Sequence, residues 1–265
     1  MLAADYQTHT YHSHDGLDSI RAFCLRAIEL GFDEIGFSEH KDFDPDDPVV
    51  DHFVYDRYAE DIARARAEFS GRLTIRMGVE VDYQRWFEDE IATYLNAHPF
   101  DYVIGSVHYV DRVRVMDACY TASRDARTAY RDYFRAVRES IESGQIDILG
   151  HLEYPNVRGI AAYGPYDASA YREELGAVLD ALLRRGVALE INTAAARKGA
   201  GVTFPCPEVV AWYAQRGGRR LTFGSDAHRP EDLGSGWSSA HEIARAAGLT
   251  EVTVYEARIP AQRPL

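Results

Sequence analysis

The sequence predicts an α/β barrel with parallel strands, and two patterns favour this fold class. Short apolar runs recur along the 265 residues, and helix-like segments separate them. A strand buried on both faces reads as a near-continuous apolar run, and strands that alternate with helices form parallel sheets. A chain of this length suffices for one barrel. The runs are LAADYQTH, DEIGFSEH, LTIRMGVEVDY, DYVIGSVH, DILGH, ALEIN and LTFGSDAH.

Helical segments follow these runs in order, most of them with a glycine or proline as a stop. The first is expected to be capped by Asp18 or Ser19, to run through Leu30 and to end at Gly31. The alternating valines of YVDRVRVMD predict a small hairpin near the mouth of the active site, and EVTVYEAR reads as a closing strand or a tail. Because no linker or repeat interrupts the chain, we expect one domain over residues 1–265. Further helices are expected over about 56–69, 86–96, 123–143, 168–185, 207–216 and 238–247.

The composition narrows the class of protein. The formal net charge of −13 argues against a nucleic-acid-binding protein, since phosphate-backbone contacts need a basic face, but a small anionic substrate stays compatible with bound metal ions. Cys24, Cys119 and Cys206 are too few and too scattered for a disulfide framework. We expect no signal peptide, because the N-terminus lacks a basic start followed by an apolar core, and no membrane span, because no uninterrupted apolar run approaches the roughly 20 residues that one needs. We therefore expect a cytoplasmic protein without membrane contact, whose oligomeric state the sequence leaves open.

Each apolar run stops at or near a residue that binds metals or is polar. In a parallel barrel these strand ends share one face, and that face holds the active site. Imidazoles and carboxylates collected there make a site for several divalent metals. The residues at the strand ends are His9, His40, Glu80, His108, His151, Asn192, Asp226 and His228.

These motifs resemble the polymerase-and-histidinol-phosphatase (PHP) family, in its histidinol-phosphatase branch. The resemblance runs from DYQTHTYHSHDG to FGSDAHRPEDLG, with DEIGFSEH, GVEVDY, FDYVIGSVH, DILGHLEYP and LEINTAAARK between them in the family's order. It implies a distorted (β/α)7 barrel that holds two or three divalent ions (Zn²⁺, Mn²⁺ or Fe²⁺). The implied reaction is the hydrolysis of L-histidinol phosphate to L-histidinol and phosphate in histidine biosynthesis.

The first motif departs from the family pattern at one position. The family has Asp-x-His-x-His and a further ligand about five residues later. Asp5 and His9 match, Gln7 replaces the first histidine, and His14 falls at the later position with Asp15 as the alternative. An amide oxygen is a weaker ligand than imidazole, so Gln7 predicts a weakened metal position.

The resemblance also assigns roles to the other strand ends. His40, Glu80, His108, His151, Asp226 and His228 match metal ligands, with Glu80 as the carboxylate that bridges metals. Arg158 and Arg197 match phosphate-binding arginines, and Asn192 is expected to orient a ligand or the substrate. Glu80, Asp226 and His228 are the catalytic candidates, and Asp226 or His228 is a candidate proton donor to the leaving alkoxide.

Three further hypotheses concern selectivity and activity. The acidic loop after the second strand, with Asp42 and Asp44, is placed to select the amine of histidinol phosphate, although such loops are usually solvated surface. One alternative function is a PHP-family phosphoesterase that acts on another small phosphomonoester or on a phosphodiester. The other is a catalytically weak metal-binding relative, which Gln7 alone suggests.

Overall fold

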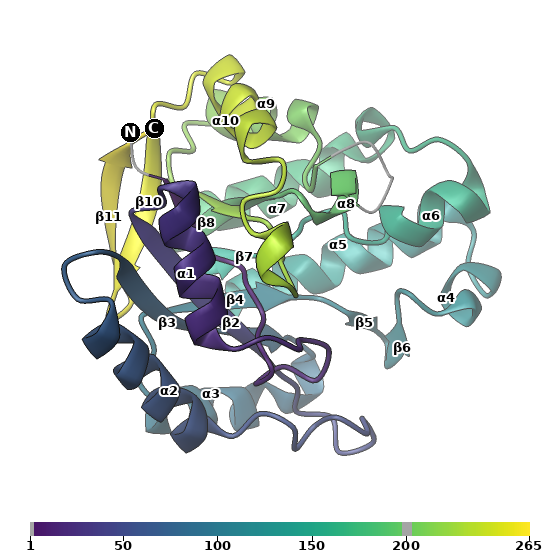
Figure 1. The fold of residues 1–265 in the computed structure, drawn as a ribbon. Coiled ribbons are helices and arrows are strands. Elements are labelled where there is room, and N and C mark those ends of the chain that lie inside the picture. The colour runs from purple at the N-terminus through teal and green to yellow at the C-terminus, as the bar shows by residue number, and fades with distance from the viewer. Residues whose placement is uncertain (1–2, 198–202) are drawn as a thin grey trace.

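The computed structural model describes residues 3–197 and 203–265, and a seven-stranded parallel sheet is its centre. The strands follow the order β1-β2-β3-β4-β7-β8-β9 (Figure 1). All neighbouring strands of this sheet pair in parallel, as the alternation of strands and helices predicts. Their bounds are β1 Ala4–Asp5, β2 Glu34–Lys41, β3 Thr74–Asp82, β4 Tyr102–Ser106, β7 Ile148–Leu149, β8 Ala188–Asn192 and β9 Leu221–Gly224.

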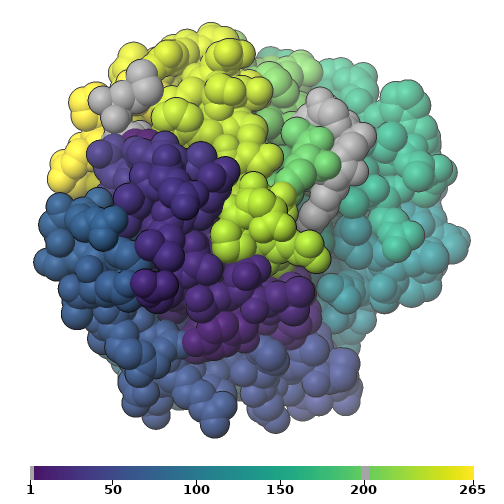
Figure 2. Space-filling model, viewed as in Figure 1, coloured from purple at the N-terminus to yellow at the C-terminus, as the bar shows by residue number. Residues whose placement is uncertain are grey.

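The first strand lies beside the last, so the sheet curls into a nearly closed barrel. The backbone N–H of Tyr6 donates to the carbonyl of Phe223 at 2.9 Å, and that of His9 donates to the carbonyl of Ala227 at 2.9 Å. Figure 2 shows the purple N-terminal segment directly against the yellow-green segment that follows β9. The predicted barrel of seven parallel strands is therefore confirmed.

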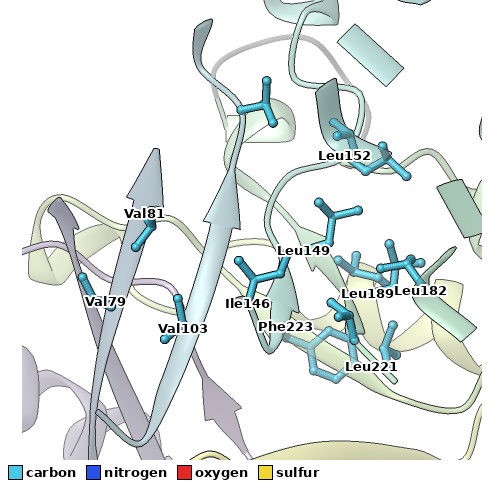
Figure 3. Packing of buried hydrophobic residues seen from close by; sticks show 14 of the residues in the cluster. Val79, Val81, Val103, Ile146, Leu149, Leu152, Leu182, Leu189, Leu221 and Phe223 are labelled. Atoms are coloured by element: carbon cyan, nitrogen blue, oxygen red, sulfur yellow. The ribbon is translucent and has the colours of Figure 1, made fainter. Parts of the chain in front are cut away.

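Residues along each barrel strand alternate between the barrel interior and the surrounding helices. On β3, Val79 and Val81 point outward into the main hydrophobic cluster, whereas Glu80 between them points inward. Figure 3 shows Val79, Val81 and Val103 in this cluster, together with Leu189 and Leu221 from β8 and β9. The outward side chains form the core, so the inward ones are available to the site.

Two glycines, Gly36 on β2 and Gly78 on β3, leave room for the Tyr102 side chain inside the barrel. Its hydroxyl donates to the carbonyls of Tyr6 (2.7 Å) and Phe37 (3.0 Å). A Cβ atom at Gly36 or Gly78 would lie 2.3 Å from atoms of the Tyr102 ring or its hydroxyl. Only glycine fits at these two positions while the ring occupies the barrel axis.

An antiparallel hairpin covers the amino-terminal ends of the strands. β10 (Glu251–Glu256) pairs with β11 (Ile259–Pro264), and the N–H of Tyr255 donates to the hydroxyl of Tyr6 at 2.9 Å. EVTVYEAR is thus a strand, but it does not close the barrel, because β9 pairs with β1 instead. Its residues complete an interior cluster of Ala4, Tyr6, Tyr102, Ile104, Ile148, Ala188, Val254 and Tyr255.

Helices surround the barrel close to the predicted positions. Ser19 caps α1 by accepting from the N–H of Ala22 at 3.2 Å, and Gly31 ends it in the left-handed region with φ 75°. In the described part of the chain, the helices fall short of the length and apolarity that a bilayer crossing needs. The helices are α1 Ile20–Leu30, α2 Tyr55–Glu68, α3 Glu88–Ala97, α4 Ala118–Ala122, α5 Ala126–Glu142, α6 Asn156–Tyr163, α7 Arg172–Arg185, α8 Ala194–Arg197, α9 Pro207–Gln215 and α10 Trp237–Ala246, with 3₁₀ turns at Arg85–Phe87, Ala168–Tyr171 and Pro230–Asp232.

The structure differs from the sequence prediction in four helical segments. The helix expected over 123–143 begins later, because the Asp125 side chain accepts from the N–H of Thr128 at 2.8 Å and starts α5 there. The helices α4, α6 and α8 lie in segments where the sequence predicts no helix. The hairpin predicted in YVDRVRVMD is confirmed as β5 (Tyr109–Val110) and β6 (Val113–Arg114).

Gly78→Ala tests the packing of the barrel interior. We expect the added methyl group to destabilise the protein by about 1–3 kcal/mol, because it overlaps the Tyr102 ring. Urea unfolding measures the loss. In a Tyr102→Ala background, which removes the ring, the same substitution should cost much less. An equal cost in both backgrounds would contradict this account of the interior.

Candidate active site and metal centre

The carboxyl ends of the barrel strands bring two groups of metal-binding side chains together. In the first group, each of His9, His40 and His228 offers one ring nitrogen, and these atoms lie within 4.8 Å of one another. In the second group, ligand atoms of Glu80, His108 and His151 lie within the same distance. The two groups combine residues from the ends of β1, β2, β3, β4, β7 and β9, as expected of a barrel whose strands all run in the same direction.

Glu80 reaches both groups. Its Oε2 lies 3.0 Å from His40 Nδ1 and 3.5 Å from His9 Nε2. Its Oε1 lies 3.0 Å from His151 Nε2. The hydroxyl of Ser106 on β4 also donates to Oε1. One buried carboxylate therefore contacts imidazoles on both sides, which is the geometry that a bridging ligand requires.

Asp226 and Asp15 complete the first group. Asp226 Oδ1 lies 3.4 Å from His9 Nε2 and 3.6 Å from His228 Nδ1. Asp15 Oδ2 lies 3.1 Å from His228 Nε2, and its Oδ1 lies 3.6 Å from His40 Nε2. His14 is more peripheral, with its Nε2 3.9 Å from Asp15 Oδ2. Of the two candidates in the first loop, Asp15 therefore contacts the group more closely.

The protonation of the histidines and the ionisation of Glu80 depend on one another. Burial lowers the pKa of His108 to about 3 and also lowers the pKa of His9, so both rings are neutral at pH 7. Burial would also lower the pKa of His40 and His151, but the Glu80 carboxylate raises both. Burial would raise the pKa of Glu80, but these histidines hold it well below its usual range. In the metal-free protein, the Glu80 carboxylate therefore favours a proton on His40 and on His151.

The donor atoms fit divalent metal ions. The buried Nε2 of His9 has no hydrogen-bond partner among the described residues, although it faces oxygens of Glu80 and Asp226. The Nε2 atoms of His108 and His151 lie only 3.3 Å apart. Neutral imidazoles and carboxylates that face one another in this way are the ligands that zinc, manganese and iron use in proteins.

Gln7 lies behind Glu80 in a hydrogen-bonded chain that fixes its orientation. The N–H of Ala194 donates to Asn192 Oδ1 at 2.9 Å, so Asn192 Nδ2 donates to Gln7 Oε1 at 2.7 Å. Gln7 Nε2 then donates to Glu80 Oε1 at 2.9 Å. In this arrangement Gln7 gives the site a hydrogen-bond donor, and its oxygen is occupied by Asn192. Asn192 thus acts on the site by orienting Gln7. It does not itself line the cavity above the ligands.

Glu190 extends the buried chain of hydrogen bonds that contains Asn192 and Gln7. Its Oε2 accepts from the N–H of His151 at 2.9 Å and lies 3.3 Å from Asn192 Nδ2. Burial raises the pKa of Glu190 to about 8, so its carboxyl carries a proton at neutral pH. A neutral Glu190 adds no further negative charge beneath Glu80.

Glu39 anchors the loop that carries the first ligands, a role that the sequence analysis missed. The buried carboxylate accepts from the N–H (3.0 Å) and the hydroxyl (2.7 Å) of Thr10, and from the hydroxyl of Ser13 (2.6 Å). Ser13 Oγ in turn lies 3.4 Å from His9 Nδ1. A proton on Nδ1 that faces Ser13 leaves the Nε2 lone pair for the site. The position of Glu39 directly before His40 was the available signal.

A cavity of about 270 Å³ lies over both groups. The loop after β2 and the β5–β6 hairpin form part of its wall. Tyr109 of the hairpin joins the two by donating its hydroxyl to Asp47 Oδ2 at 2.9 Å. Besides the ligands other than His9, the cavity is lined by Asp42, Asp47, Pro48, Val49, Tyr109, Arg114 and Tyr154.

Arg158 and Arg197 are absent from the described residues that line this cavity. Arg197 donates to the carbonyls of Ser225 (2.8 Å) and Asp226 (2.9 Å). Asp226 has φ 52°, a left-handed conformation that costs a non-glycine residue about 1–3 kcal/mol, and Arg197 holds this turn. Arg158 is exposed on α6. A phosphate-binding role for these two arginines stays a prediction.

Comparison with known proteins identifies the family. The model of the PHP domain matches residues 5–194. Histidinol-phosphatase of Lactococcus lactis is 30% identical, over 96% of this chain and 95% of the relative, and a probable histidinol-phosphatase of Deinococcus radiodurans is 31% identical, over 94% and 95%. A crystal structure of histidinol phosphate phosphatase from Lactococcus lactis, complexed with zinc, L-histidinol and phosphate, superposes with a TM-score of 0.86 and 28% identity, covering 98% of both chains. The chain therefore belongs to the PHP family, in the group of the histidinol-phosphatases.

Proposed function

We propose that the protein is a metal-dependent phosphomonoesterase that hydrolyses L-histidinol phosphate to L-histidinol and inorganic phosphate. The observation that carries this proposal is Glu80, a single buried carboxylate in contact with two groups of imidazoles at the base of a cavity. The similar Lactococcus lactis enzyme, which was solved with zinc, L-histidinol and phosphate, supports the choice of substrate. A cytoplasmic location and the lack of a nucleic-acid partner stay predictions from the sequence.

Two or three divalent ions fit the residues of the site. His9, His40, His228, Asp15 and Asp226 would hold ions at the first group, and His108 and His151 at the second, with Glu80 shared. Bound divalent ions bring the pKa of a bound water to about 7 and neutralise phosphate oxygens. This chemistry suits a phosphate monoester, whose uncatalysed hydrolysis is among the slowest known.

The side chains of the chain itself prepare the site for that reaction. Glu39 and Ser13 orient His9, so its Nε2 faces the carboxylates of Glu80 and Asp226 without a proton. The leaving alkoxide is strongly basic and needs a proton. Asp226 and His228 line the cavity and are our candidates for this step, which only a residue that is not bound to a metal ion can perform.

Metal removal tests the proposed activity. We expect the purified protein to release phosphate from L-histidinol phosphate, a chelator to abolish this activity, and added Mn²⁺ or Zn²⁺ to restore it. Glu80→Gln should lose bound metal, measured by mass spectrometry, and activity with it. Glu90→Gln, an exposed change on α3, is the matched control and should keep both. Activity that survives chelation, or its absence from the metal-loaded protein, would refute the proposal.

Gln7→His tests the weakened metal position beside Glu80. Because the Gln7 oxygen is occupied by Asn192, a metal held by His9, Glu80 and Asp226 lacks a ligand that the family pattern supplies. We expect the imidazole to raise the affinity of the most labile metal about tenfold or more. Competition titration against a chromophoric chelator measures this affinity in both proteins. Identical titration curves would show that position 7 does not contribute to metal binding.

The acidic loop presents a different pair of carboxylates to the cavity from the pair that the sequence suggested. Asp42 lines it, as expected, but Asp44 is buried and accepts from the N–H of Asp46 at 3.0 Å within its own loop. Asp47 lines the cavity in its place, held by Tyr109. We assign Asp42 and Asp47 to the positive amine of the substrate.

Asp47→Asn tests the selection of the amine. An ion pair at a partly exposed site contributes up to about 1 kcal/mol, so discrimination against phosphate esters without an amine should fall about fivefold. The ratio of kcat/KM values for L-histidinol phosphate and an amine-free phosphate ester measures it. Asp46→Asn, an exposed change that does not face the cavity, should leave the ratio unchanged. Equal ratios in all three proteins would assign the loop to solvated surface.

A further inference from the structure

One cation faces the ligand groups from the hairpin that follows β4. Arg114 on β6 is the one lysine or arginine among the described residues that line the cavity. It pairs across the hairpin with Tyr109, which directly follows the ligand His108. The N–H of Val115, next to Arg114, donates to the carbonyl of His108 at 2.8 Å. The hairpin is therefore joined to the metal centre at both of its ends.

The Arg114 guanidinium has neither a hydrogen bond nor an ion pair with any described residue, although it shares the cavity with five carboxylates. Asp47, which lines the same cavity from the loop after β2, is instead bound by the Tyr109 hydroxyl. Burial is the main cause of the lowered pKa of His14 and of His108, and the charge of Arg114 contributes to both. Arg114 thus lies near His108 of the second group and near His14, at the edge of the first.

We propose that Arg114 binds the phosphate group of the substrate over the metal centre. A guanidinium binds phosphate with two parallel N–H donors, and a cavity lined by carboxylates leaves an anion few other partners. Asp42, Asp47, Asp15, Asp226 and Glu80 all line the same cavity, so a phosphate dianion needs a directional donor besides the metal ions. Among the described residues Arg114 has no competing ion pair, whereas Arg197 already donates to two backbone carbonyls.

The hydrogen bond between Tyr109 and Asp47 gives this arrangement its selectivity. It engages one oxygen of Asp47 and holds the loop after β2 against the hairpin. A substrate with a phosphate and an amine would meet the cation on one wall and carboxylates on the neighbouring one. This reading rests on the proposed function for the substrate, but the phosphate-binding role of Arg114 does not depend on which ester is hydrolysed.

Substitutions in the hairpin test the proposal on the metal-loaded protein. Arg114→Ala should lower kcat/KM and weaken competitive inhibition by inorganic phosphate about 10- to 100-fold, the loss expected for a charge-assisted hydrogen bond. Arg114→Lys should recover part of both. Arg112→Ala is the matched control, since Arg112 lies in the same hairpin but stacks over Trp86 and Phe87, and it should change neither quantity. Metal content should be the same in all of these proteins.

Two outcomes would overturn the assignment. One is an Arg114→Ala enzyme with unchanged kcat/KM and unchanged inhibition by phosphate. The other is a loss of phosphate inhibition in Arg158→Ala or Arg197→Ala that Arg114→Ala does not produce. Calorimetric titration of inorganic phosphate separates this question from the substrate. If the wild type fails to hydrolyse L-histidinol phosphate but its phosphate binding weakens in Arg114→Ala, the proposed function fails and the role of Arg114 stands.

Discussion

The contact between β1 and β9 is the constraint on which the site depends. The first strand is only two residues long and could not hold its position alone. Backbone hydrogen bonds tie it to the last strand, and the buried Asp5 carboxylate accepts from the N–H groups of Ser225 (3.0 Å) and Gly234 (3.2 Å). Without this closure His9 would not meet Asp226 and His228, which come from the other end of the chain. Barrel closure and assembly of the first ligand group are therefore one event.

The free-energy cost of burying so many ionisable groups has to be offset by contacts close to each group. Burying an isolated carboxylate costs several kcal/mol of folding free energy. Attraction between the carboxylate and a buried cation offsets this cost only when further hydrogen bonds satisfy both partners. Glu80 obtains those bonds from Ser106 and Gln7, and Glu39 obtains them from Thr10 and Ser13. Glu190 follows another route, since burial raises its pKa until it is neutral. Because each carboxylate is compensated differently, substitutions at the three positions would not be interchangeable.

Sequence patterns predicted those features that depend on position along a strand. The run of apolar residues up to His40 or His108 locates both the strand and the ligand at its end, because backbone hydrogen bonding in a parallel barrel aligns such ends. The closure of β9 on β1 and the separate β10–β11 hairpin were less accessible, since both depend on pairing between distant segments. The short helix α6 begins after Pro155 in a segment with weak periodicity, which explains why the sequence did not predict it.

The directions of the side chains in the site were harder to predict from the sequence than the positions of the residues along the strands. The sequence could place Asp44 and Arg197 after strand ends, but not show that Asp44 turns to its own loop or that Arg197 binds the Asp226 carbonyl. Gln7 was recognised as a departure from the family pattern, yet its orientation follows from Ala194 and Asn192, which a motif cannot encode. Arg114 lies outside every motif. Its role emerges only once the hairpin is folded over the cavity.

Because side chains fill the axis of the barrel, the substrate and the products have to use the same opening. Tyr6 and Tyr102 occupy the interior, and the β10–β11 hairpin covers its far end, so the described residues leave no route through the barrel. Substrate entry and the departure of both products must share the mouth between the loop after β2 and the β5–β6 hairpin. With phosphate held over the metal centre, as proposed above, the alcohol would leave before it. The single mouth therefore predicts that the two products are released in a fixed order.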